Sequence, residues 1–127
     1  MVRLSPSGDL VQRIEVGAKP RGIAVGDGGV WTSNSLVGSV SRIDPLTGEV
    51  VGDPTGVGTR PAGVAVGEGY VWVANTEDGT VSRLDPGSGE KVGDDIDVGE
   101  RPRGIAIGAG SVWVSNSGDG TVTRIDP

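Results

Sequence analysis

The sequence contains no cysteine, no histidine and no phenylalanine, and it has only one tyrosine and three tryptophans among 127 residues. Without cysteine there can be no disulfide, thiolate metal ligand or cysteine nucleophile. Without histidine there is no imidazole for acid–base catalysis or for binding zinc. The chain also lacks the run of about 18 apolar residues of a membrane-spanning helix, and its start lacks a signal-peptide pattern. We therefore expect a soluble protein with no membrane partner, and its compartment stays open.

Basic residues are in the minority, with 11 lysines and arginines against 17 acidic residues and a formal net charge of -6. This balance argues against a general nucleic-acid binder. Glycine is abundant instead, at 24 residues, accompanied by 8 prolines. The length suits a single domain over residues 1–127.

A repeat of about 41 residues dominates the chain. Five residue types recur in the same register, and their positions are Pro20, Pro61 and Pro102; Trp31, Trp72 and Trp113; Asn34, Asn75 and Asn116; Arg42, Arg83 and Arg124; and Asp44, Asp85 and Asp126. Repeats of about 40–45 residues are typical of four-stranded propeller blades. The repeats begin near residues 20, 61 and 102.

Each repeat predicts strands and no helix. In the middle repeat, short β-rich segments at 63–67, 70–74, 80–84 and 91–98 are separated by Gly, Asp-Gly and Pro turns. Complete four-strand sets cover 20–57 and 61–98, three strands cover 102–126, and residues 10–16 supply one outer strand. The sequence thus predicts an all-β propeller with three antiparallel four-stranded blades. Residues 3–6 duplicate 124–127, so we expect the start to fray.

The middle repeat reads Pro61-x-Gly-Val-Ala-Val-Gly, then Val71-Trp-Val-Ala-Asn, then Asp78-Gly-Thr-Val-Ser-Arg-Leu-Asp-Pro. This pattern resembles the YVTN/NHL-type β-propeller superfamily, and most of all its virginiamycin B (streptogramin) lyase branch. The resemblance implies a propeller. The lyases are larger and seven-bladed, and they use a histidine with metal assistance. Since this chain has no histidine, the resemblance supplies no catalytic residue, metal ligand or cofactor, and other members of the superfamily are binding domains of sensors.

Three blades are too few for a ring, because propellers usually have four to eight. An arc of three would expose two apolar sheet faces, and burying them at about 25 cal/mol per Å² favours association. We expect a homodimer that forms a six-bladed ring, with a nine-bladed homotrimer as the alternative. Residues 10–16 of one copy would then cover the free strand edge near 120–125 of its partner.

Two residue sets are candidate sites. The loops between repeats carry five of the basic residues, and these are Lys19, Arg21, Arg60, Arg101 and Arg103. They could form a weak anion site at one rim, or they could pair with Glu77, Asp78, Glu100 or Asp119. Asn34, Asn75 and Asn116 could line the channel, or they could cap turns.

Other recurring residues have structural interpretations. Each Arg two positions before Asp suggests an ion pair or a turn brace, and the tryptophans suggest a core between blades rather than a ligand cage. Asp94, Asp95 and Asp97 suggest edge protection rather than a calcium loop. The predicted function is a non-catalytic, self-assembling propeller module. The alternatives are a degenerate lyase-like enzyme using carboxylates and a metal, and excised blades of a ligand-binding sensor.

Overall fold

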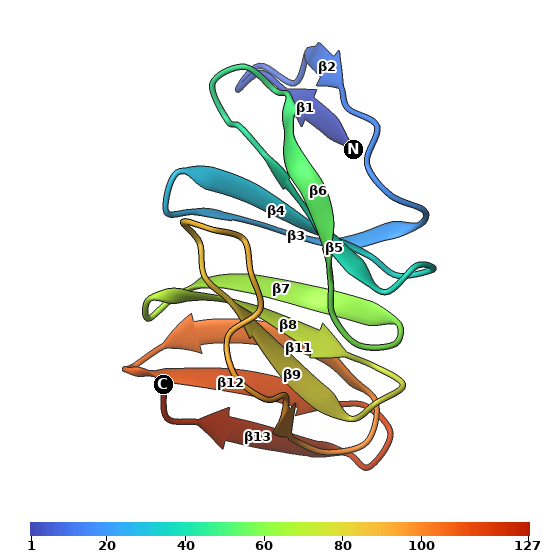
Figure 1. Ribbon diagram of the computed structural model, residues 1–127, viewed down its shortest axis with the longest axis vertical. Helices are drawn as coiled ribbons and strands as arrows, with labels where there is room; N and C mark the ends of the chain where they lie inside the picture. The colour runs from blue at the N-terminus through green and yellow to red at the C-terminus, as the bar shows by residue number, and fades with distance from the viewer.

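The computed structural model describes residues 1–127 and contains thirteen strands and no helix (Figure 1). None of its elements is a helix long and apolar enough to cross a membrane. The all-β prediction is confirmed. The strands form four antiparallel sheets. One of them is the two-stranded N-terminal hairpin of β1 (Val2–Leu4) and β2 (Leu10–Arg13), and the other three are called the first, second and third sheets. The first sheet contains β3 (Pro20–Gly26), β4 (Gly29–Asn34), β5 (Ser39–Ile43) and β6 (Val50–Gly56). The second contains β7 (Pro61–Gly67), β8 (Tyr70–Asn75), β9 (Thr80–Leu84) and β10 (Ile96–Asp97), and the third contains β11 (Pro102–Gly108), β12 (Ser111–Asn116) and β13 (Thr121–Ile125).

In the three sheets that follow the N-terminal hairpin, the first two strands are joined by a two-residue turn with both residues at positive φ. In the second sheet these are Glu68 at 51° and Gly69 at 84°. Two positive φ values define the type I′ turn, whose twist matches that of a β-hairpin. The same turn joins β3 to β4 and β11 to β12, so each repeat opens with the same tight hairpin.

The sheets lie face to face in chain order, with β7 between β3 and β11 (Figure 1). The inner strands come closest at glycines, because a Cβ added at Gly63 would meet the backbone carbonyl oxygen of Arg103. The core therefore lies between sheets rather than within one. Between the first and second sheets it contains Trp31 and Val40, which pack with Val64, Val71, Val73 and Leu84 of the next sheet.

Two strand predictions need correction. The start of the chain, which was expected to fray, forms strand β1 and pairs with β2 from Val2 to Leu4. The outer strand expected over 91–98 is reduced to β10 and one bridge from Lys91. Gly93 turns the chain out at a φ of 66°. Asp95 then accepts hydrogen bonds within the blade, from Lys91 Nζ at 2.7 Å and from Ser82 Oγ at 2.8 Å.

Candidate functional site

The outer face of the third sheet is open, although it carries the same Trp, Val and Arg positions as a buried face. Trp72 and Val81 of the second sheet have no exposed surface, because the third sheet covers them. The equivalent Trp113 is 38% exposed and Val122 is 67% exposed. The difference in exposure of these equivalent residues follows from whether another sheet covers the face.

The opposite end of the chain, at the first sheet, has residues equivalent to those that cover Trp72 inside the molecule. Inside the molecule, Trp72 and Val81 pack on a set of apolar residues that comprises Ile96, Val98, Ile105, Ile107, Val112, Val114 and Ile125. At the first sheet, the equivalents of Ile96, Val98, Val112 and Ile125 form a small cluster of Ile14, Val16, Val30 and Ile43. This cluster contains no tryptophan. It is therefore an interface core that lacks the residues equivalent to Trp72 and Val81.

A cavity of about 270 Å³ lies in this incomplete core. Its apolar lining includes Ile14 from the hairpin side and Ile23, Val25, Val30 and Ile43 from the first sheet. Val25 is 72% exposed, whereas its equivalent Ile107 packs against the core of the second interface. The cavity stands at the place that a tryptophan fills in the two complete interfaces.

The five basic residues predicted as an anion site are all exposed. Lys19, Arg60 and Arg101 occupy equivalent loop positions with φ of 53°, 55° and 53°. In each case the carbonyl oxygen accepts a hydrogen bond from the backbone of the loop after the Trp strand, as with Thr76 N at 3.0 Å from Arg60 O. Arg60 also pairs with Glu77, at 3.4 Å between Nε and Oε1. The other four cations form no ion pair.

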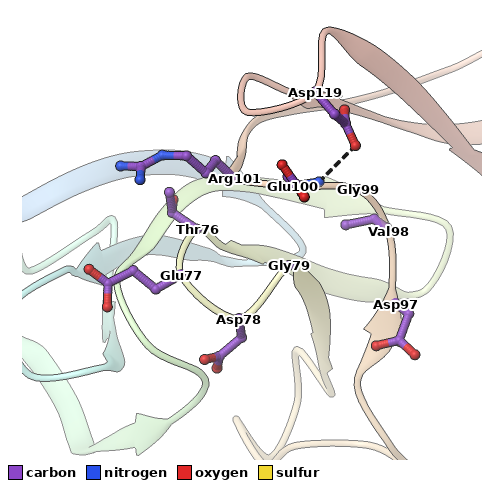
Figure 2. A pocket seen from close by; sticks show the side chains of 10 residues that line it. All are labelled: Thr76, Glu77, Asp78, Gly79, Asp97, Val98, Gly99, Glu100, Arg101 and Asp119. Carbon is purple, nitrogen blue, oxygen red and sulfur yellow. Dashed lines mark hydrogen bonds between the residues drawn. The ribbon is translucent and has the colours of Figure 1, made fainter.

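Carboxylates surround the loops between the second and third sheets (Figure 2). They line a hollow of about 740 Å³ whose one basic residue is Arg101, and they are Glu77, Asp78, Asp97, Glu100 and Asp119. No three of these groups lie close enough together to hold a metal ion. The rim has mixed charge, because the loops after β8 and β12 contribute acids beside the cations that the sequence singled out.

Asp119 has a defined role in this hollow. Its carboxylate accepts hydrogen bonds from Thr121 Oγ1 and from Glu100 N, the latter at 3.0 Å. These bonds, that from the Thr121 hydroxyl foremost, lower the pKa of Asp119 below its ordinary 3.8. The charged side chain thus ties the loop preceding β11 to the loop preceding β13.

The three repeated asparagines are buried. Asn75 Oδ1 accepts from Gly58 N at 3.0 Å, and its Nδ2 donates to Thr80 Oγ1 at 3.1 Å and Ser82 Oγ at 2.9 Å. Asn34 and Asn116 make the same three types of contact. Each asparagine therefore braces the loop between two repeats, and the channel-lining interpretation stays a prediction.

The recurring arginines stack on aromatic rings. Arg42 lies 5.2 Å from the Trp31 ring centroid, and Arg124 lies 5.8 Å from that of Trp113. Of the two predicted roles of the Arg and Asp pair, the ion pair occurs only in the last repeat, at 3.5 Å. In the first two repeats the other predicted role holds, because the Asp braces its turn, as in the 2.8 Å bond from Leu46 N to Asp44. The stacking was not predicted from the sequence, although a hairpin register that places Arg42 directly opposite Trp31 brings the two side chains to the same face of the sheet.

Solved structures share this fold at low sequence identity. Hydrazine synthase from Kuenenia stuttgartiensis is 27% identical with a TM-score of 0.77, and the match covers 91% of this chain and 36% of that chain. Virginiamycin B lyase from Staphylococcus aureus is 22% identical with a TM-score of 0.82, covering 97% and 44%. A luciferin-regenerating enzyme is 17% identical with a TM-score of 0.76, covering 98% and 50%.

The chain spans half or less of the length of these structures. No protein-family model and no curated protein sequence matches it. Its stacked antiparallel sheets and its likeness to the lyase structures together establish a β-propeller fold.

Proposed function

We propose that the chain is a non-catalytic propeller module that assembles with itself through its two open ends. One observation supports this most directly. The exposed Trp113 and Val122 are the residues missing from the incomplete core around Val30 and Ile43. A second copy would supply them in the arrangement that already occurs twice within the chain. The partner is thus an identical copy, and the interface continues the repeat.

The preferred assembly is a homodimer in which two three-blade arcs form a six-bladed ring. Six lies within the usual range of about four to eight blades, whereas the nine of a homotrimer exceeds it. A two-fold arrangement uses both open ends of both copies, so no apolar face stays in water.

Light scattering on the 127-residue chain over a range of concentrations tests the proposal. We expect the mass of two chains, and a mass of three would replace the dimer by the trimer. Val122→Asp places a charge in the interface and should give single chains. Val37→Asp is the matched control, because Val37 is 59% exposed and the other repeats carry Asp78 and Asp119 at this position. A single-chain mass for the unaltered protein at every concentration would overturn the proposal.

The alternative occupants of the open ends are further blades of a longer propeller, and the short coverage of the matched structures favours this as the second candidate. In that setting the chain would belong to a lyase-like enzyme or a ligand-binding sensor. A metal that binds the folded state raises its melting temperature. Stabilisation by a divalent cation would therefore favour the metal-dependent enzyme over the non-catalytic module.

Weak anion binding at the rim is a separate proposal, supported by the four exposed cations without an ion pair. Titration calorimetry with citrate on the assembled protein tests it. Arg21→Ala with Arg103→Ala should weaken the binding, and added salt should compete. Equal heats in both proteins would leave the cations as a solvated rim.

A further inference from the structure

The N-terminal hairpin has the geometry of the outer corner of a blade. Its turn contains hydrogen bonds from Ser5 N to Asp9 O and from Gly8 N to Ser5 O, both at 2.8 Å. The corner between β5 and β6 is one residue longer and contains a similar pair, from Asp44 N to Glu49 O at 2.9 Å and from Gly48 N to Asp44 O at 2.8 Å. β1 and β2 thus correspond to the third and fourth strands of a blade.

The third sheet has the opposite deficit. It contains β11, β12 and β13, and no fourth strand pairs with the outer edge of β13. In the first sheet that edge, on β5, is covered by β6. The chain therefore ends in three inner strands without an outer one, and it begins with an outer strand whose neighbour is β1.

The third strand of this blade is present twice. Val2-Arg3-Leu4 in β1 matches Thr123-Arg124-Ile125 in β13, and the Pro after the next residue is shared as well. The pairing at the corner is equivalent too, because Leu4 lies opposite Leu10 as Ile43 lies opposite Val50 in the first sheet, although a bulge then shifts the register of β1 by one residue. Only one of the two copies can occupy the edge of β2 with which β1 pairs here.

We propose that the edge of β2 is the binding site for β13 of a second copy, and that β1 is a placeholder that leaves this edge when the ring closes. This inference rests on the proposed self-assembly. β1 is the weaker occupant, since it has three residues, with Val2 52% and Leu4 59% exposed. β13 has five residues, pairs along its length with β12, and anchors itself through Ile125, which is 8% exposed.

Pairing of β1 with β2 raises the protein concentration that assembly requires. While β1 covers β2, the chain is not competent to receive β13, and the apparent dissociation constant rises by the inverse of the competent fraction. A hairpin formed about 90% of the time therefore weakens assembly about tenfold. In return, the edge of β2 is not left free to pair with unrelated strands.

A matched pair of cysteine variants tests the exchange, and the absence of natural cysteine makes each crosslink unambiguous. Directly paired residues of antiparallel strands have Cα atoms about 4.5–5.5 Å apart, within disulfide reach. Leu4→Cys with Leu10→Cys should lock β1 onto β2 within one chain. Ile125→Cys with Leu10→Cys should link β13 of one chain to β2 of another, giving covalent dimers on non-reducing gels.

Oxidised Leu4→Cys/Leu10→Cys should need at least about tenfold more protein for half-assembly than its reduced form. Arg3→Pro removes a strand donor from β1 and should lower the concentration for half-assembly. If the unaltered chain assembles but the locked variant assembles equally well, or if Ile125→Cys/Leu10→Cys gives no interchain crosslink, the exchange is wrong while self-assembly stands. A chain that is single at every concentration would instead refute the proposed function itself.

Discussion

The interior and the ends of this molecule present nearly the same residues with opposite outcomes. Between the second and third sheets, Trp72 lies in a closed core, whereas Trp113 at the free end remains 38% exposed. The local hairpins are alike at both places, including the type I′ turns and the buried asparagines. Local structure in this chain is therefore set within each repeat, and burial of the sheet faces is set by the neighbour.

The largest expected effect separates the two tryptophans. Trp72→Ala should destabilise the folded chain by about 3–5 kcal/mol, because it leaves a cavity in a closed core. Trp113→Ala should cost much less in dilute single chains and should weaken assembly. Urea unfolding at low protein concentration measures the stability of single chains, and unfolding at high concentration adds the contribution of assembly. Equal costs at low concentration would contradict the contrast between interior and end.

A pair of glycines sharpens the comparison. Gly63→Ala should cost about 1–3 kcal/mol through overpacking, because its Cβ would meet the carbonyl oxygen of Arg103 in the next sheet. Gly108→Ala has no neighbour within 4 Å of its Cβ, so thermal unfolding of single chains should not change. In the assembled ring it should weaken association, since a Cβ at the equivalent Gly67 would lie 2.9 Å from Ile107 Cδ1.

The asparagine braces should respond equally at both places. Asn75→Ala and Asn116→Ala each remove the acceptor of a loop N–H, at 3.0 Å from Gly58 and 3.2 Å from Gly99. Leaving such a donor unpaired should cost about 1–3 kcal/mol in each case. Chemical denaturation measures the costs. A much smaller cost for Asn116→Ala would mean that the end sheet depends on its neighbour even for local order.

The smallest effect concerns acid. The lowered pKa of Asp119 means that its carboxylate stabilises the folded state above its unfolded pKa, and this contribution is lost as pH falls below 3.8 through the folded value. Asp119→Asn should therefore flatten the acid limb of the stability profile slightly. Assembly at neutral pH should not change, since the bonds stay within one repeat. Melting curves between neutral and acidic pH compare the two proteins.

The repeat predicted the fold well because period, turns and strand propensity all act within about 41 residues. The boundaries of the first sheet, from Pro20 to Gly56, agree closely with the expected set over 20–57. The short outer strand of the second sheet was not predictable, because it depends on the side chain of Asp95 bonding back to Ser82. Local propensity contains no information on such a contact.

The site was predicted less completely. Exposed apolar ends followed from counting blades. The acids that could pair with the rim cations were also named from the sequence, but which cation meets which acid was not, and only Arg60 forms such a pair. Glu77 and Arg60 are 17 positions apart in sequence and meet only because the loops pair across the rim. The role of the asparagines was open because a strand-end amide fits a channel and a brace equally well until its burial is known.

The unequal burial of the tryptophans gives the chain a built-in optical reporter. Of the three indoles, Trp31 and Trp72 are almost fully enclosed, and Trp113 alone meets water to any extent. An indole that loses water shifts its fluorescence emission toward shorter wavelengths. Association with a second copy would change the emission of Trp113 and leave the emission of Trp31 and Trp72 unchanged. The exposed end thus provides a label-free signal from which the association of unmodified chains can be followed in real time.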